Sequence, residues 1–216
     1  MTATETVAPA GPPPVELAEL LGDSTSSAGQ APTWPALRDA LRAAEARGVS
    51  TLLLPAPGPE AHPFEATTVA AAALRATTAL RVVVPLDPDR VAPYNAARVL
   101  GTLAYLGPDR VWVTPAGAPD TPPDAARWAD WLAAVHALWT SFPRAAIVAD
   151  RAAGRYFDAS RVDRSGHHGP HHSVAGPLNL PTPPGAPPRV WPGTGTTPEI
   201  PPDPEAAPDP GTEDPR

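Results

Sequence analysis

Between residues 33 and 143 the sequence alternates between segments with the apolar spacing of a helix and short runs that are almost wholly apolar. Such runs, apolar at every position, are typical of strands that are buried on both faces. A helix that joins two of these strands makes them parallel and crosses over in the right-handed sense. The alternation therefore predicts an α/β fold with a parallel sheet covered by helices. Strands are expected at 51–54, 80–84 and 110–113, and helices at 34–47, 63–78, 93–106 and 125–141.

Residues with strong positional preferences mark the ends of these elements. Thr33 and Asp124 are suited to N-caps, because their side-chain oxygens can accept hydrogen bonds from the first turn of a helix. Pro93 suits the first turn of a helix, Gly48 suits a helix end, and Pro85 is expected to close the second strand. Three or four such units are too few to complete an eight-stranded barrel, so we expect the strands to form an open arc.

Composition divides the chain into parts. Of its 216 residues 34 are proline, and they concentrate toward both ends. Segments that are poor in aromatic and branched side chains cannot offset the entropy that is lost when they become ordered. We therefore expect both ends to be disordered. The expected parts are a disordered N-terminal segment at 1–32, a β/α half-barrel at 33–143, a further segment at 144–190 and a disordered, acidic, Pro-rich tail at 191–216.

Charge and composition also exclude several classes of function. The formal net charge is −7, and no basic stripe is present that could hold a nucleic-acid backbone. The absence of cysteine excludes disulfides and thiolate chemistry. The sequence has neither a leader pattern nor about 18 consecutive apolar residues. We therefore expect a cytoplasmic protein that binds neither nucleic acid nor a membrane.

Four of the six histidines lie in the stretch HHGPHH, from His167 to His172. Imidazoles that close together are typical of a metal site. A dedicated site would also need carboxylates or other partners that orient the imidazoles at defined spacing. The neighbouring sequence offers none, so we expect adventitious binding of Ni²⁺ or Zn²⁺ at most and no physiological metal site.

Longer motifs are more specific than the histidines. ALRATT at 73–78 precedes an expected strand, and PYNAAR at 93–98 opens the next expected helix. LWTSF begins at Leu138, and HHGPHHSVAGPLNLP spans 167–181. In this order and spacing the chain resembles the luciferase-like, flavin-dependent monooxygenases. The resemblance points to the branch that oxidises nitrilotriacetate, pristinamycin precursors and dibenzothiophene sulfone, and it covers roughly half of the chain.

The resemblance implies a fold and a cofactor. The fold would be a (β/α)₈ (TIM) barrel, present here in part, with 144–190 as a family insertion. Reduced FMN, supplied by a separate flavin reductase, would bind at the carboxyl ends of the strands and react with O₂ to oxygenate a small organic substrate. The cofactor contacts implied are Thr114, Arg127, Trp128, Gly193 and Thr194, and no catalytic residue is assigned. His167 and His171 take the family's two histidine positions, which favours a turn-rich segment over a metal site.

Several positions depart from the family pattern. Asp124 and Trp128 stand where the family has His and Tyr, the Asn of its WNVVTS strand is missing from the matching stretch at 111–115, and its phosphate loop is shortened to the stretch around Gly193. Each lost hydrogen bond to a charged or buried group costs about 1–3 kcal/mol. We therefore expect this chain to bind FMN more weakly than about 10 µM. Unpaired strand edges further predict self-association into a homo-oligomer.

Three hypotheses remain open at this level. The chain is a flavin-dependent monooxygenase, a catalytically inactive remnant of one that acts as a partner or has no function, or a histidine-rich binding module. The motif order disfavours the third. Individual residues also have simpler interpretations, because Thr114 at a strand end can serve as a backbone partner and Trp128 can pack in a core with Trp131 and Trp139.

Overall fold

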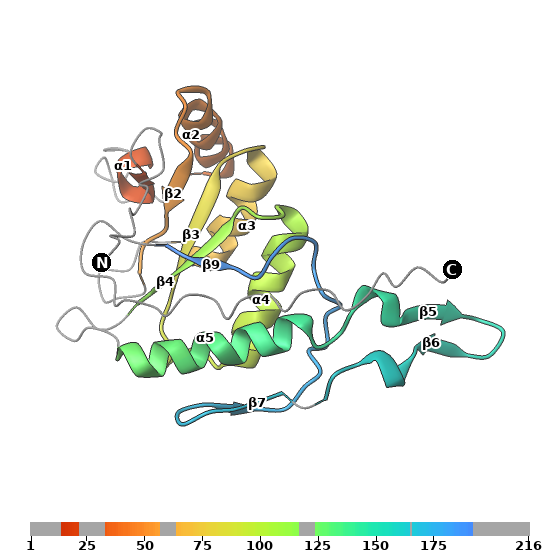
Figure 1. Ribbon diagram of the computed structural model, residues 1–216. Coiled ribbons are helices and arrows are strands. Elements are labelled where there is room, and N and C mark those ends of the chain that lie inside the picture. Colours follow the sequence, from red (N-terminus) through yellow and green to blue (C-terminus); the bar gives the residue numbers. More distant parts are fainter. Residues whose placement is uncertain (1–13, 22–32, 57–63, 117–123, 165, 192–216) are drawn as a thin grey trace, which may run out of the picture.

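The computed structural model describes residues 14–21, 33–56, 64–116, 124–164 and 166–191. Its centre is a five-stranded sheet in which all neighbouring strands are parallel (Figure 1). The order of the strands is β1-β2-β3-β4-β9, so the parallel arrangement of the three expected strands is confirmed. The strands are β1 (Val15–Glu16), β2 (Thr51–Leu53), β3 (Arg81–Leu86), β4 (Val111–Pro115) and β9 (Arg189–Val190).

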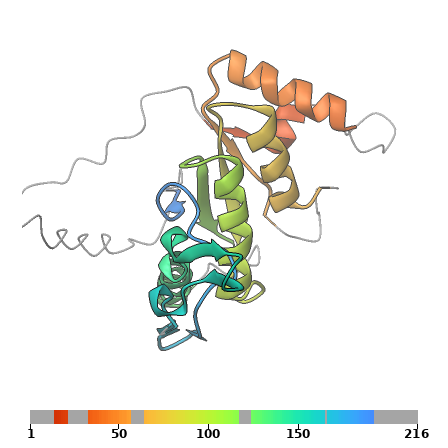
Figure 2. The same cartoon turned by 90° about the vertical axis from the view of Figure 1, so that its right-hand side faces the viewer.

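Helices connect the strands, and α2, α3 and α4 lie along the same side of the sheet (Figure 2). Asp124 caps the last helix as expected, with its Oδ1 accepting from the backbone N–H of Ala126 at 2.9 Å. Thr33 makes no side-chain cap, and only its carbonyl accepts from the N–H of Leu37. The helices are α1 (Leu17–Leu21), α2 (Trp34–Ala46), α3 (Ala66–Ala76), α4 (Pro93–Leu106) and α5 (Ala125–Thr140).

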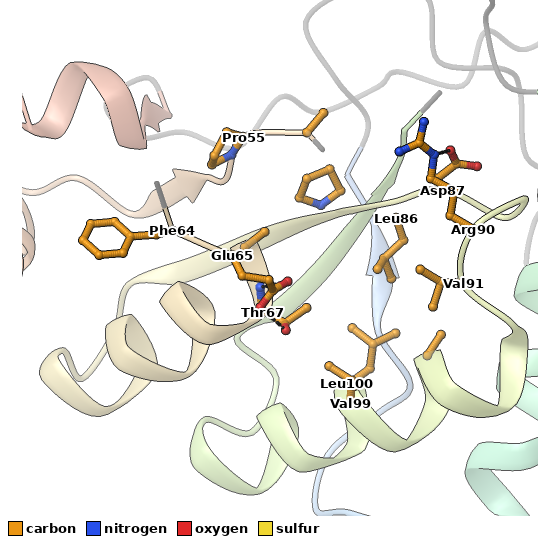
Figure 3. A pocket seen from close by; sticks show the side chains of 14 residues that line it. Pro55, Phe64, Glu65, Thr67, Leu86, Asp87, Arg90, Val91, Val99 and Leu100 are labelled. Carbon is orange, nitrogen blue, oxygen red and sulfur yellow. Dashed lines mark hydrogen bonds and ion pairs between the residues drawn. The ribbon is translucent and has the colours of Figure 1, made fainter. Parts of the chain in front are cut away.

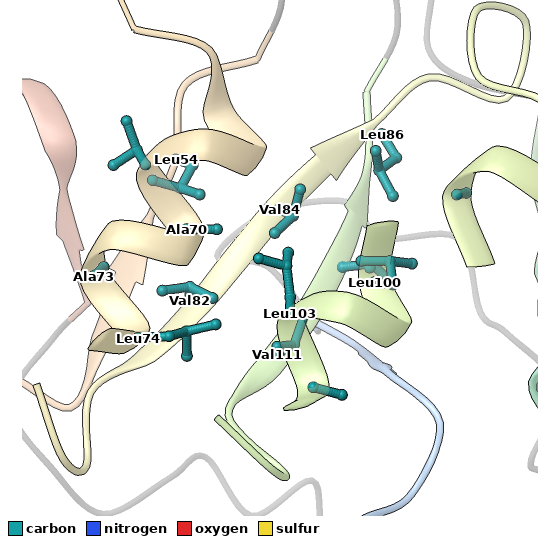
Figure 4. Close-up of a cluster of buried hydrophobic side chains, with 14 of the residues drawn as sticks. Leu54, Ala70, Ala73, Leu74, Val82, Val84, Leu86, Leu100, Leu103 and Val111 are labelled. Carbon is teal, nitrogen blue, oxygen red and sulfur yellow. The ribbon is translucent and has the colours of Figure 1, made fainter. Parts of the chain in front are cut away.

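The core lies between this sheet and its helices. Alternate strand residues such as Val82 and Val84 point toward α3 and α4, where they meet buried side chains such as Leu74 and Leu103 (Figure 4). Side chains of β2 and β4 extend the same layer. Trp128, Trp131 and Trp139 of α5 are fully buried, which agrees with the packing interpretation of the three rings.

Strand β3 continues through Pro85 to Leu86, so the expected end of this strand at Pro85 is wrong. The N–H of Arg81 donates toward the β2 side and the N–H of Val82 toward β4. By this alternation, residue 85 faces the β2 side, where β2 has already ended at Leu53. A proline is tolerated there because no ladder hydrogen bond is lost.

Residues 15–21 correct the expected disorder of the segment 1–32. Val15 and Glu16 pair in parallel with β2, and Leu17 and Leu21 of α1 are buried in the core. The prediction failed because it used the average composition of 1–32, whereas the short stretch VELAELL within it carries enough apolar side chains to pack. At the other end, Trp191 is also buried, with its ring tilted by 60° against that of Trp112, and the rest of the expected tail lies outside the described residues.

Two charged side chains hold the turn between α3 and β3 at the amino edge of the sheet. The guanidinium of Arg110 donates to the carbonyls of Leu74, Thr77 and Leu80, at 2.6, 3.2 and 3.2 Å. The carboxylate of Glu45 accepts from the backbone N–H groups of residues 78–80. Burial alone would raise the pKa of Glu45, but these N–H donors lower it. The turn is therefore clamped from both sides.

Residues 144–188 leave the helix–strand alternation, and the chain then returns to the sheet as β9. A β5–β6 hairpin extends away from the sheet, and a second hairpin, β7–β8, lies beside α5 (Figure 1). The elements of this segment are η2 (Arg144–Ala146), β5 (Ile147–Asp150), β6 (Arg155–Phe157), η3 (Ala159–Arg161), β7 (His167–His168) and β8 (Ser173–Val174).

The sheet is open, as expected from the small number of units. Strands β1 and β9 form its two edges and do not pair with each other within the described residues. Self-association through these edges stays a prediction that sedimentation of the chain would test. Among the helices in the described ranges, none combines the length and the apolar character that crossing a membrane requires.

Candidate functional site

A cavity of about 640 Å³ opens at the carboxyl edge of the sheet, where parallel α/β folds place their ligands (Figure 3). It lies where β2 and β3 end, between the start of α3 and the middle of α4. Most of its wall is apolar. The main apolar side chains are those of Pro55, Phe64, Leu86, Val91, Val99 and Leu100.

The first charged group of the cavity is Glu65, which caps α3. Its carboxylate accepts from the backbone N–H groups of Thr67 and Thr68 at 2.9 and 2.8 Å, and also from both threonine hydroxyls. Burial would raise the pKa of Glu65, but these four donors lower it. The carboxylate is therefore ionised at neutral pH, and its oxygens are already satisfied within the helix end.

The other two charged groups of the cavity neutralise each other. Arg90 Nε lies 3.2 Å from Asp87 Oδ2, and Asp87 Oδ1 accepts from the backbone N–H of Asp89. The Asp87–Arg90 pair leaves Glu65 as the one uncompensated charge among the described side chains that line the cavity. The site is thus an apolar cavity with a negative rim.

The two family-like motifs PYNAAR and GPLN meet next to this edge. Tyr94 Oη donates to the carbonyl of Pro177 at 3.3 Å and accepts from the N–H of Asn179 at 3.0 Å. Leu178 is fully buried, and its N–H donates to Ser141 Oγ at 2.9 Å. The segment then runs along α4, where Leu180 packs so closely on Gly101 that a Cβ atom there would collide with it. Long-range hydrogen bonds therefore fix GPLN against α4 and α5.

The histidine cluster is organised by a carboxylate that sequence reasoning missed. Asp130, buried on α5, accepts from His167 Nε2 at 2.7 Å and from the backbone N–H groups of His171 and His172 at 2.8 and 2.7 Å. Burial would raise the pKa of Asp130, but these hydrogen bonds lower it. Any side chain at residue 169 would collide with this carboxylate, which explains the glycine there.

The remaining histidines do not complete a metal site. His168 Nδ1 pairs with Ser173 Oγ at 2.8 Å. Burial lowers the pKa of His172, against the opposing effect of Asp130, so its imidazole is neutral at pH 7. Within the ranges that the structure describes, no group of three or more His, Asp or Glu side chains is arranged to hold a metal ion. The stretch anchors the β7–β8 hairpin to α5.

The structure does not gather the residues that the resemblance implies as flavin contacts around the cavity. Thr114 is half-buried at the end of β4, and strand alternation turns it away from the helix layer. Arg127 Nε lies 2.6 Å from Asp89 Oδ1, so its charge is compensated. Gly193 and Thr194 lie outside the described residues.

The side chain of Trp128 is packed in the core and does not face the cavity. Its ring is 0% exposed and stacks on Trp131, with 5.0 Å between the ring centroids. Trp131 Nε1 in turn donates to the carbonyl of Val91 at 2.7 Å. Together with the Arg127–Asp89 pair, these contacts hold the β3–α4 loop against α5. Burial thus favours a packing role for Trp128 over cofactor stacking.

The described residues fit an apolar molecule better than they fit FMN. The phosphate of FMN needs uncompensated basic side chains or a cradle of N–H groups. At the carboxyl edge, however, Arg90 and Arg127 are paired with aspartates, and Glu65 adds a negative charge. In the part of the chain that the structure describes, the site therefore does not by itself accommodate the phosphate.

Three curated relatives are similar to the chain in sequence. A pristinamycin IIA synthase component of Streptomyces pristinaespiralis is 34% identical over 177 residues, which are 80% of this chain and 62% of that protein. Dibenzothiophene-sulfone monooxygenase of Rhodococcus erythropolis is 32% identical over 147 residues, covering 62% of this chain and 32% of the relative. Nitrilotriacetate monooxygenase component A of Aminobacter aminovorans is 30% identical over 135 residues, covering 56% and 30%. The chain thus spans between about a third and three fifths of these relatives.

Solved structures share the fold. A long-chain alkane monooxygenase superposes with a TM-score of 0.59 at 19% identity, covering 71% of this chain and 43% of that one. A riboflavin lyase solved with modified FMN and riboflavin gives a TM-score of 0.60 at 23% identity, covering 73% and 42%. No family model matches the chain.

The structural neighbours carry the same parallel βα units as parts of TIM barrels. The expected partial barrel is thereby confirmed. The chain is similar in sequence to the pristinamycin IIA synthase, dibenzothiophene-sulfone and nitrilotriacetate enzymes, and it shares its fold with luciferase-like monooxygenases.

Proposed function

We propose that the chain is a flavin-dependent monooxygenase that uses reduced FMN and O₂ to oxygenate a small organic substrate. The observation that carries the proposal is the cavity of about 640 Å³ at the carboxyl edge of a barrel sheet, since barrel enzymes bind substrates there. The names of the sequence relatives support the same reaction class.

In this proposal the described residues bind the substrate and shield it from water. Val91, Val99 and Leu100 supply the apolar wall of the cavity. The Trp131 and Arg127 contacts hold the β3–α4 loop that forms one side of it. Reduced FMN would supply the electrons with which one oxygen atom of O₂ enters the substrate and the other leaves as water.

The flavin itself would be held largely by residues outside the described ranges, Gly193 and Thr194 among them. Thr114 is the described residue best placed to approach it, because it lies near the end of β4 beside Pro85, which lines the cavity. The proposal further includes a separate flavin reductase as partner and a cytoplasmic location. A catalytically inactive remnant is the alternative, and the open cavity gives it no support.

Turnover in the presence of a flavin reductase tests the proposal. The purified chain is mixed with NADH, a reductase, dibenzothiophene sulfone and about 100 µM FMN, a concentration chosen because we expect affinity weaker than about 10 µM. Oxygenated product above the level of reductase alone is the expected result, measured by mass spectrometry with ¹⁸O₂. Product that forms equally without the chain would overturn the proposal in favour of the inactive remnant.

A further inference from the structure

The polar groups of the carboxyl-edge cavity are already used within the protein. Four hydrogen-bond donors of α3 surround the Glu65 carboxylate, and Asp87 and Arg90 pair with each other. A ligand therefore meets apolar walls rather than hydrogen-bonding groups that await a partner. Binding in such a cavity follows the apolar area that the ligand removes from water.

The charge of the cavity limits its ligands further. Glu65 is ionised, and the Asp87–Arg90 pair does not offset its charge. A carboxylate brought into the cavity would lose hydration against the apolar wall and would lie near the exposed Glu65 carboxylate at the rim, with no unpaired cation among the described lining residues to receive it. The same ligand without its charge would meet no such penalty.

We propose that this cavity selects uncharged, predominantly apolar substrates and rejects carboxylates. The inference rests on the proposed function, because a ligand of the cavity is a substrate only if the chain is a monooxygenase. The binding preference itself can be measured without flavin. It separates this chain from enzymes of the same branch that act on polycarboxylates, and it assigns the discrimination to Glu65 together with the apolar wall.

A matched pair of probes isolates the effect of charge. Biphenyl-4-methanol and biphenyl-4-carboxylate share one skeleton and differ in charge at pH 7.5, so isothermal titration of the full chain compares them directly. We expect the alcohol to bind at least tenfold more tightly than the carboxylate. Equal affinities, or tighter binding of the carboxylate, would overturn the inference.

A matched pair of variants places the binding in the cavity. Val99 lines the cavity from α4 and is 39% exposed, so Val99→Asp puts a charge into the site without opening the core. Thr102, one turn further along α4, is exposed and does not line the cavity, so Thr102→Asp is the control. We expect Val99→Asp to weaken binding of the alcohol tenfold or more, and Thr102→Asp to leave it within twofold. Equal binding by Val99→Asp and Thr102→Asp would show that the cavity is not the site.

The two proposals fail separately. If the alcohol binds in preference to the carboxylate but the reductase assay gives no product, the substrate class stands and the monooxygenase function falls. If product forms while the two probes bind equally, the function stands and the selection by the cavity falls. Circular dichroism spectra of all variants confirm that each comparison is made between folded chains.

Discussion

The sheet with its helices and the segment 144–188 differ in the contacts that dominate their stability. The sheet layer is held mainly by a continuous layer of buried apolar side chains such as Leu74 and Val82. The segment buries few apolar side chains, Leu178 among them, and is attached by long-range hydrogen bonds such as those of Asp130 and Tyr94. The first kind of stability is spread over many residues and the second is concentrated in a few. Polar substitutions should therefore have local effects in the segment and apolar truncations should have global effects in the sheet.

The largest effect is expected from truncation in the sheet layer. Leu74→Ala removes a side chain that is 1% exposed, and the residual cavity should lower the free energy of unfolding by about 2–5 kcal/mol. Urea denaturation followed by circular dichroism measures it. Val148→Ala, at a position that is 37% exposed on the β5–β6 hairpin, serves as control and should cost less than about 1 kcal/mol. Equal losses would remove the distinction between the two regions.

The second largest effect is expected from loss of the Asp130 hydrogen bonds, which attach the segment to α5. Asp130→Ala removes the acceptor of three hydrogen bonds and should cost about 3 kcal/mol, because buried donors lose their partner. Hydrogen exchange should rise at residues 166–178 before it rises in β3. Asp89→Ala breaks the exposed pair with Arg127 and should cost at most about 1 kcal/mol. Uniform loss of protection across the chain would show that the segment is not a separate unit.

How far the sequence predicts this molecule differs between the same two regions. Periodicity located β2, β3 and β4 and the helices between them, because an apolar repeat reports directly on a buried face. It missed β1 and α1, whose short apolar stretch lies inside a segment of disorder-like composition. It also missed Asp130, since nothing local links this residue to a histidine 37 positions later.

The candidate site was predictable only in its location. Parallel strands place ligands at their carboxyl edge, and the cavity lies at that edge. The use of each side chain was not predictable, since the burial of Trp128 and the pairing of Arg127 with Asp89 depend on how α5 packs on the β3–α4 loop. Tertiary contacts of this kind leave no periodic signal.

Acid should loosen the segment before the sheet. The pKa of His172 is lowered by burial, so the folded state favours the neutral imidazole and loses stability as the pH falls through and below the unfolded value of about 6.5. The pKa of Asp130 is also lowered, so its contribution is present above the unfolded value of about 3.9 and is lost as the pH falls through the lower folded value. Hydrogen exchange at pH 7.5 and 5.5 should show faster opening of β7–β8 at the lower pH. His172→Gln should reduce this difference.

The smallest effect concerns one hydroxyl. Tyr94→Phe removes the bridge between Pro177 and Asn179 and should cost about 1 kcal/mol, since the ring and its packing remain. Tyr105→Phe is the matched control, because its hydroxyl donates to Pro181 at a more exposed site and should cost less. Thermal denaturation ranks the two variants. The reverse order would argue that the GPLN contact is incidental to the attachment of the segment.

The clamp of Glu45 and Arg110 on the turn between α3 and β3 has a consequence for how such a chain can diverge. One added or deleted residue in that turn would pull several backbone groups out of register with both side chains at once. At the opposite edge the β3–α4 loop is held by one ring N–H and one exposed ion pair, the Trp131 and Arg127 contacts, rather than through several consecutive backbone groups. Over evolutionary time, changes in loop length should therefore accumulate at the carboxyl edge, where they alter what is bound, while the amino edge keeps its length. The amino edge of the sheet should therefore be conserved in loop length, and the carboxyl edge should vary together with the ligand that is bound.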